Sequence, residues 1–221
     1  MDPAERFALI IGGPPTPWSL DVVCSLMSAA FTHRLRTDEV LSALDDLADE
    51  CQEATLEGVL AAMRPHLRGN VDEYYDPRNS FIDEVLERGI GLPITLSVIA
   101  MEIGRRVGAP IGGIGPPRHF MVRDAKRNVF GDPFHGGAVY DRVGLAAAWD
   151  RLMGAEHAFD EMHLVPLSER AILIRMLNNL RALYLRQADP RALWALATMR
   201  GAFAELVHEA PEHARWVRSW N

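Results

Sequence analysis

The stretch between Gly91 and Gly108 constrains the fold most, because it predicts one helix that is apolar on nearly every side. Pro93 suits a first helical position, since its ring fixes a helical φ and its missing N–H would have no partner there. Gly108 is the residue type that commonly ends a helix. Apolar side chains lie both on one helical stripe and off it: Leu96, Ile99, Ile103 and Val107 on the stripe, and Ile94, Val98 and Met101 beside it. Such a helix is buried on most sides, so we expect the chain to pack around it.

Two short segments after this helix predict a β-hairpin, because they are rich in glycine, β-branched and aromatic residues and are separated by a polar run. They are Ile111–Val122 and Asn128–Phe134. With the turn centred between Ala125 and Lys126, antiparallel pairing places His119 directly opposite Asp132, with Cβ atoms about 4.5–5.5 Å apart. A carboxylate in that position would orient the imidazole. The pairing depends on register, since a slip of one residue turns the two side chains to opposite faces.

Helical patterns fill the segments on either side of this core. The first 70 residues predict a helical region, in which acidic side chains from Asp45 to Glu50 form a solvated face. Asn79 or Ser80 is placed to cap a helix over Phe81–Arg88. The later segments are expected as a short helix over Leu145–Leu152, an extended crossing over Phe159–Pro166 that could add a strand, a long helix from Ser168 to about Gln187, a partner from Asp189 to about His208, and a last short helix from Pro211.

Composition excludes several classes of protein. The chain has 221 residues, of which 48% are hydrophobic, enough to bury a core as one domain or as one domain with an appendage. Its net charge of −7 argues against a general binder of nucleic acids or membrane surfaces. No apolar run reaches membrane-span length and the start lacks the basic residues of a signal peptide, so we expect a cytoplasmic protein. Cys24 and Cys51 lie in helical patterns and are expected to be reduced thiols.

Short motifs spread over most of the chain carry a family resemblance. They are Asp76–Ser80, Glu84–Arg88, Gly91–Ser97, Gly113–Phe120 and Asp132–Gly137. In this order they resemble the bacterial transglutaminase-like proteins named after SirB, which are often followed by tetratricopeptide-type helices. The resemblance implies an α+β fold with a helical region over 1–70, a transglutaminase-like core over 71–166, in which a central helix packs on a small antiparallel sheet, and a tetratricopeptide-like helical hairpin over 167–221.

The resemblance also implies where chemistry would occur. In active members of the wider transglutaminase-like, papain-like fold, a Cys at the start of the central helix works with a His on a strand and an Asp on the next strand. His119 and Asp132 match the last two. Pro93 stands at the position of the nucleophile, so this chain departs from the catalytic pattern. Thr95 and Ser97 are hydroxyls close by, yet neither occupies the nucleophile's position, and either can bond a nearby carbonyl.

Two functions from different classes follow. The first is a non-enzymatic module that binds a protein or peptide in a partly solvated cleft, with no cofactor. The expected cleft residues are Asn79, Pro93, Thr95, Arg118, His119, Asp132 and His135. The second is a hydrolase or transferase that uses His119 and Asp132 with a water, a metal or an unconventional nucleophile.

Two further sites are compatible with the same residues. His119, Asp132 and His135 together offer two imidazoles and a carboxylate, a set that can hold iron or zinc with open positions. The start of the central helix, next to His119 and Arg118, could instead hold an anion, although Pro93 removes one donor.

Overall fold

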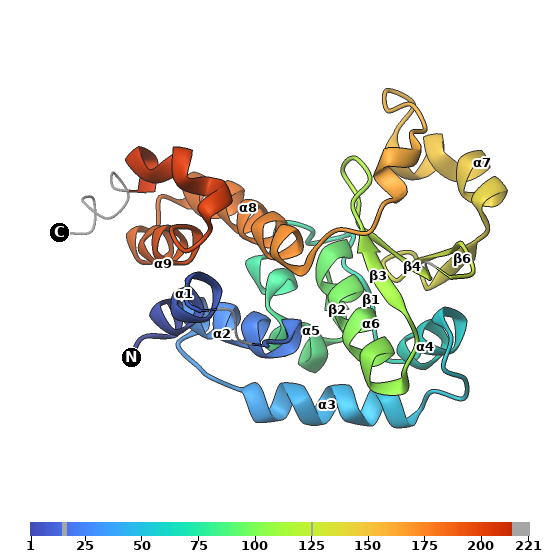
Figure 1. The fold of residues 1–221 in the computed structure, drawn as a ribbon, viewed down its shortest axis with the longest axis horizontal. Helices are drawn as coiled ribbons and strands as arrows, with labels where there is room; N and C mark the ends of the chain where they lie inside the picture. The colour runs from blue at the N-terminus through green and yellow to red at the C-terminus, as the bar shows by residue number, and fades with distance from the viewer. Residues whose placement is uncertain (15–16, 125, 214–221) are drawn as a thin grey trace.

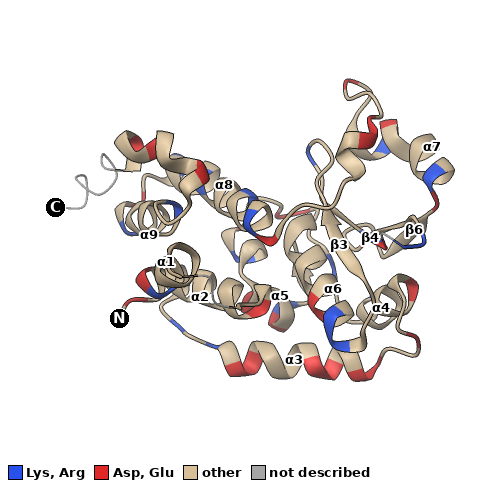
Figure 2. Cartoon of the chain, viewed as in Figure 1, with Lys and Arg blue, Asp and Glu red and all other residues tan. Residues whose placement is uncertain are grey.

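A computed structural model describes residues 1–14, 17–124 and 126–213 of the chain. Most helices of the first half lie on one side of the central helix α6 (Pro93–Val107) and a four-stranded sheet lies on the other, as Figure 1 shows. The α+β fold expected from the sequence is confirmed. The first four helices are α1 (Pro3–Gly12), α2 (Leu20–Thr32), α3 (Thr37–Asp49) and α4 (Leu56–Met63). The acidic side chains predicted to be solvated on α3 are exposed, and Figure 2 shows the positions of the acidic residues along this helix in red.

Helix α6 (Pro93–Val107) begins and ends where the sequence predicts. Gly108 ends it with a φ of 80°, in the left-handed region that favours glycine. All residues from Pro93 to Ala100 are buried, because α2, α3, α4, α5 (Ile82–Arg88), α8 (Glu169–Gln187) and the sheet all contact this helix. One continuous hydrophobic core therefore includes side chains from α1 through α6 to α8 and α9 (Pro190–Arg200).

The sheet differs from the predicted hairpin. Strands β3 (Ile111–Ile114), β4 (Met121–Asp124), β5 (Val129–Asp132) and β6 (Ala138–Tyr140) form one antiparallel sheet in that order. The segment predicted as a single strand over residues 111–122 is thus two strands joined by a loop. Pro116 and Pro117 lack the N–H that a ladder requires, and Arg118 has a φ of 59°, so the strand cannot continue through them.

The register of β4 and β5 also differs from the prediction. Val122 pairs with Gly131 and Asp124 with Val129, two residues away from the register that would set His119 directly opposite Asp132. The Asp124 carboxylate accepts hydrogen bonds from the N–H groups of Lys126 and Arg127, at 3.0 and 3.1 Å, which fixes a longer loop. The predicted turn centre includes Ala125, which lies outside the described residues. A shift of two residues keeps the same faces of the strands together.

Other predicted elements need correction. Asn79 and Ser80 belong to the short helix η1 (Pro77–Ser80), and Phe81 is the cap residue of α5. The hydroxyl of Ser28 on α2 accepts the Ile82 N–H at 3.1 Å instead, so the cap comes from a distant part of the chain. Residues 159–166 form no strand but contain the short helix η2 (Glu161–Leu164). The backbone bond to the sheet edge is made just after this segment, from the Leu167 N–H to the Gly113 carbonyl.

The C-terminal helices are close to those expected. Ser168 caps α8 through its hydroxyl, which accepts the Ala171 N–H at 3.2 Å. Helix α9 ends at Arg200, earlier than predicted, and η3 (Ala204–Glu209) follows. The predicted helix from Pro211 is helical as far as residue 213, and its continuation lies outside the described residues. Helix α7 (Arg142–Met153) covers the other face of the sheet over a small second core around Trp149.

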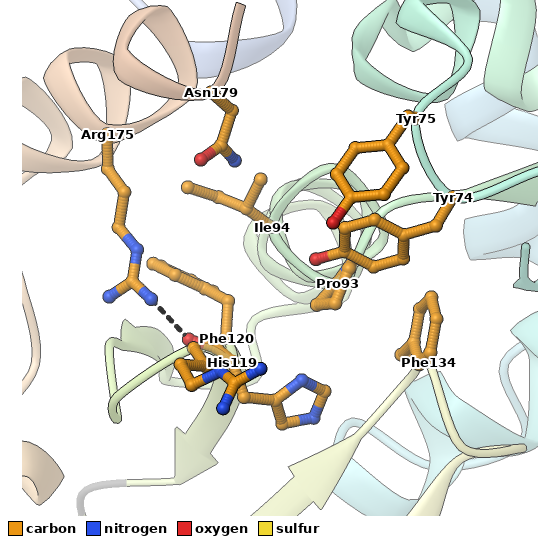
Figure 3. A pocket seen from close by; sticks show the side chains of 10 residues that line it. Tyr74, Tyr75, Pro93, Ile94, His119, Phe120, Phe134, Arg175 and Asn179 are labelled. Atoms are coloured by element: carbon orange, nitrogen blue, oxygen red, sulfur yellow. Dashed lines mark hydrogen bonds between the residues drawn. The ribbon is translucent and has the colours of Figure 1, made fainter. Parts of the chain in front are cut away.

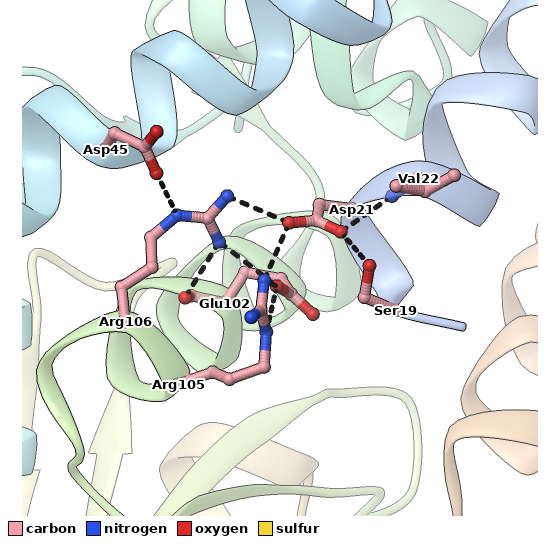
Figure 4. Close-up of polar contacts among 7 residues, drawn as sticks. All are labelled: Ser19, Asp21, Val22, Asp45, Glu102, Arg105 and Arg106. Carbon is pink, nitrogen blue, oxygen red and sulfur yellow. Dashed lines mark hydrogen bonds and ion pairs between the residues drawn. The ribbon is translucent and has the colours of Figure 1, made fainter. Parts of the chain in front are cut away.

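A buried ion cluster joins three helices at the C-terminal end of α6 (Figure 4). Asp21 on α2 is fully buried and accepts hydrogen bonds from Arg105 at 3.0 Å and Arg106 at 2.9 Å. Arg106 also bonds the exposed Asp45 of α3 at 2.6 Å. Burial raises the pKa of the nearby Glu102, against its bond with Arg105. The cluster holds α2 and α3 against α6.

Within the described ranges, the helices are all too short or too polar to cross a bilayer.

Candidate functional site

His119 and His135 converge on one carboxylate oxygen. Nε2 of His119 lies 2.8 Å from Oδ2 of Asp132, and Nδ1 of His135 lies 2.8 Å from the same oxygen. His119 lies near the end of the loop before β4, Asp132 ends β5, and His135 lies in the turn that follows. The predicted contact between His119 and Asp132 is therefore present, although His119 reaches it from the loop before β4 and not from a position opposite Asp132 in a strand.

The second oxygen of Asp132 is fixed by the backbone. Oδ1 accepts hydrogen bonds from the N–H groups of Phe134 at 3.1 Å and His135 at 3.2 Å. Burial by itself would raise the pKa of Asp132, but the hydrogen bonds from His119 and His135 outweigh it and hold the pKa well below its usual range. The bond to Asp132 raises the pKa of His135 above its ordinary value, against partial burial. Asp132 is thus an ionised carboxylate that orients two imidazoles.

Burial is greater here than the sequence led us to expect. His119 is only 6% exposed and Asp132 is fully buried, whereas the prediction placed them in a partly solvated cleft. The ring of Phe134 covers His119 edge-on, at 6.0 Å between ring centres. His135 is the accessible member, with 45% of its side chain exposed.

A pocket of about 500 Å³ opens above His119. Its walls come from the segment before η1, the start of α6, the loop before β4, the turn after β5, and α8 (Figure 3). Side chains from these segments line it: Tyr74, Tyr75, Pro93, Ile94, Arg118, His119, Phe120, Phe134, Arg175 and Asn179. Aromatic rings and cationic groups predominate, and none of the lining residues is acidic.

The structure gathers only part of the predicted cleft. Pro93, Arg118 and His119 line the pocket, while Asp132 lies behind His119 and His135 lies beside it. Asn79 is fully buried away from the pocket, where its side chain bonds Asn70 at 3.0 Å and the Glu73 carbonyl at 2.7 Å. Thr95 is fully buried within the packing of α6 and does not line the pocket. Neither residue lines the pocket.

Sequence reasoning missed the wall that α8 supplies. Arg175 donates hydrogen bonds to the carbonyls of Pro116, at 3.0 Å, and His119, and its guanidinium lies over the ring of Phe120. Asn179 follows four residues later on the same face of the helix. The spacing was visible in the sequence, but nothing local indicated that this face of α8 lies against the loop before β4.

Nucleophiles are scarce at this site. Pro93 shares the pocket with His119, so the side chain at the start of α6 is one without a reactive group. Cys24 on α2 is fully buried against Met176 of α8, and burial raises the pKa of its thiol. The hydroxyls of Thr95 and Ser97 are buried and have no hydrogen-bond partner within the described part of the chain, rather than the nearby carbonyl that the sequence suggested.

The donor set of His119, Asp132 and His135 suits a transition metal. Their ligand atoms all lie within 4.8 Å of one another. Two imidazoles and a carboxylate are a common set for zinc and for non-haem iron. The backbone N–H groups on Oδ1 of Asp132 would fix the orientation of that ligand. A metal would have to replace the protons that now bind both imidazoles to Asp132.

Comparison with known proteins assigns the chain to a family. The model of the transglutaminase-like superfamily matches residues 38–178, which contain α6, the sheet and most of the pocket. The chain belongs to this superfamily. No solved structure gives a significant match.

Curated bacterial relatives have uninformative names. The chain is similar to UPF0162 proteins of two Xylella fastidiosa strains, and it is 38% identical to each. The match covers 66% of this chain and 56% of the relative in strain Temecula1, and 80% of this chain and 66% of the relative in strain 9a5c. A UPF0162 protein of Pseudomonas aeruginosa is 30% identical over 72% of this chain and 60% of the relative. The chain thus spans between about half and two thirds of the length of these relatives. Over a shorter stretch, which covers 25% of this chain and 9% of the relative, the chain is 36% identical to human F-box only protein 21.

Proposed function

We propose that this chain is a non-enzymatic member of the superfamily, of the SirB type, and that its pocket binds a segment of another protein. One observation carries the proposal: Pro93 lines the same pocket as His119. The resemblance to active members assigns the position of Pro93 to their nucleophile. Without a thiol or hydroxyl at that position, the imidazole has no nucleophile at the start of α6 to deprotonate. The pairing with Asp132 then serves to fix the wall of a binding site.

The walls of the pocket suit a peptide. Tyr74 and Tyr75, which are 37% and 69% exposed, present rings at the rim, and Phe134 extends this surface inward. Aromatic side chains provide large contact areas with little loss of conformational entropy on binding. We further propose that α8 and α9 are a tetratricopeptide-like pair and that the protein acts in the cytoplasm on a protein partner, not on nucleic acids or membranes.

A peptide selection tests this function. Random dodecapeptides displayed on phage are selected on the full chain, and the affinities of the winners are measured by fluorescence anisotropy. We expect Tyr75→Ala to weaken their binding about tenfold, since aromatic anchors commonly contribute 1–2 kcal/mol or more. Met162→Ala is the matched control, because Met162 is exposed on η2, outside the pocket. Winners that bind both variants equally, or no winners at all, would contradict the proposal.

A second function has one observation in its favour, the convergence of His119, Asp132 and His135. A metal there could activate a water, which would supply a hydrolase or transferase with the nucleophile that Pro93 lacks. Zn²⁺ titration by calorimetry at two pH values tests it directly, since metal binding must release protons. Binding that is lost in His135→Ala, together with hydrolysis of peptide or ester substrates, would replace our first proposal. If neither zinc binding nor hydrolysis is observed, the proposal of a non-enzymatic binding module stands.

A further inference from the structure

Two adjoining pockets form one groove along α8. The pocket above His119 shares Tyr74, Tyr75 and Asn179 with a smaller pocket of about 120 Å³, which extends to Arg186. Arg175, Asn179, Ala182 and Arg186 follow one another at helical spacing, so a single stripe of α8 forms one wall of this groove. Arg175 and Asn179 both project from α8 toward the pocket in Figure 3.

The groove carries positive charge in a chain whose net charge is −7. Arg118, Arg175 and Arg186 line it with His119, and no lining residue of either pocket is Asp or Glu. Arg118 is held by an exposed Glu156 at 2.7 Å. Arg186 lies over the ring of Tyr75, 5.9 Å from its centre. The stripe therefore has a cation at each end and a neutral amide between them.

Arg175 is the most informative of these cations. It has no carboxylate partner among the described residues; its bonds go to the carbonyls of Pro116 and His119. Burial lowers its pKa, which means that the charged form is held there at a cost in solvation. Gly115 leaves room for it, because a Cβ at that position would lie 2.3 Å from Nη1 of Arg175. A half-buried guanidinium that is held in place without a carboxylate partner can bind an anionic group of a ligand.

The centre of the groove indicates a peptide rather than another anion. The side-chain amide of Asn179 makes no hydrogen bond within the part of the chain described, so its donor and its acceptor are both free to meet a peptide unit. Arg175 and Arg186 are about 16 Å apart along the helix, which matches about five residues of an extended peptide. Tyr74 and Tyr75 form the opposite wall.

We propose that the groove binds an extended acidic peptide segment, with Arg175 and Arg186 each holding a carboxylate and Asn179 bonding the peptide backbone between them. This inference rests on the proposed binding function and names its ligand class. An Arg–carboxylate contact adds both strength and orientation, since the planar guanidinium can offer two parallel N–H groups.

The first test compares each selected dodecapeptide with a version in which Asp and Glu are replaced by Asn and Gln. We expect the selected sequences to be enriched in acidic residues and the neutral versions to bind about tenfold more weakly. Raising NaCl to about 1 M, where charges more than about 3 Å apart are screened, should remove most of the difference. If neutral versions bind equally well but still depend on Tyr75, the binding function stands and the acidic ligand is wrong.

The second test changes the cations. Arg186→Gln removes an exposed charge with little risk to folding. We expect it to lower the affinity for the acidic peptides about three- to tenfold and to leave the affinity for their neutral versions unchanged. Arg6→Gln is the matched control, because Arg6 is an exposed arginine on α1, outside the groove. Arg175→Gln should have the larger effect, with a thermal melt to show that the variant is folded; should it unfold, Arg186→Gln still decides. Equal binding by Arg186→Gln and Arg6→Gln would overturn the proposal.

A competing ligand is tested in the same assay. Single-stranded oligothymidylate also combines negative charge with stacking surfaces, so it can compete for arginines and tyrosines. We expect it to bind much more weakly than the acidic peptides at equal salt. Tighter binding of the oligonucleotide, lost in Arg186→Gln and Tyr75→Ala, would assign the groove to nucleic acid and reject the peptide.

Discussion

Nε2 of His119 lies 2.8 Å from Oδ2 of Asp132, although the two residues are 13 positions apart and only Asp132 lies in a strand. The contact leaves Nδ1 as the ring nitrogen of His119 that Asp132 does not bind. In a chain with a nucleophile at the start of α6, this arrangement would support proton transfer. Here it fixes a buried imidazole in the floor of the pocket.

The burial of this pair predicts a cost for breaking it. Asp132→Asn should lower the free energy of unfolding by about 1–3 kcal/mol, because an amide nitrogen cannot accept the bonds that the carboxylate now accepts. His119→Ala should remain folded at a similar cost, since domains usually have about 5–15 kcal/mol of stability. Urea unfolding measures both. A cost near zero for Asp132→Asn would mean that the bonds of this carboxylate contribute nothing net.

The ion pair between Asp132 and His135 predicts a pH dependence. The pKa of His135 is raised in the folded protein, so its stabilising effect is complete below about 6.5 and is lost as the pH rises through the raised value. The pKa of Asp132 is lowered, so its contribution is present above the ordinary value of 3.8 and is lost as the pH falls further. The stability difference between wild type and His135→Ala should therefore shrink from pH 6 to 9. A difference that stays constant would contradict the pair.

Core positions on α6 should behave differently from the pocket. Ile99 and Ile103 are fully buried, and truncating either to Ala should cost about 2–5 kcal/mol, the usual penalty for emptying a core site. Thermal and urea unfolding give the values. Val143→Ala is a control, because Val143 is 74% exposed on α7 and should cost little. A small cost at Ile99 would indicate that the core relaxes around the missing atoms.

In the ion cluster of Figure 4, Arg106 bonds both the buried carboxylate of Asp21 and the exposed carboxylate of Asp45, so the two can be compared. Asp21→Asn removes a fully buried carboxylate that pairs with Arg106 and should cost about 3–5 kcal/mol, because the buried charge on that side of the guanidinium loses its partner while Glu102 and Asp45 remain on the other sides. Asp45→Asn removes an exposed partner of the same side chain, 67% accessible, and should cost less than about 1 kcal/mol. Equal costs, measured by urea unfolding, would show that burial does not decide the strength of this cluster.

Sequence patterns predicted those parts of the fold that local residues determine. Pro93 and Gly108 mark the ends of α6, and its apolar faces predict its central place. The register of the hairpin was wrong because the turn depends on the Asp124 side chain and on Asn128, whose φ is 56°. Ser28, which caps α5, comes from a distant helix.

The candidate site was predicted in the same partial way. Motifs brought together His119, Asp132 and Pro93, because a family pattern fixes their positions in the fold. Arg175 and Asn179 were missed, because a stripe on a helix does not reveal which surface it faces. Asn79 and Thr95 were both expected in the cleft, Thr95 because it lies near the start of the central helix, whereas the structure buries both of them outside the pocket. Tertiary contacts therefore decide which polar residues reach the pocket.

The position of Pro93 gives the last prediction. In Pro93→Cys, with Cys24 and Cys51 changed to Ala, the new thiol should lie at the start of α6 in the pocket that His119 lines. Both the helix end and a protonated imidazole favour a thiolate, so its pKa should fall below the free value of about 8.5, toward the range of about 3.5–7.5 seen at such sites. Iodoacetamide labelling as a function of pH measures this midpoint, and adding His119→Ala should raise it. A midpoint at or above about 8.5 that His119→Ala does not change would mean that position 93 does not face the histidine. The assignment of Pro93 to the nucleophile's position in the family would then be wrong.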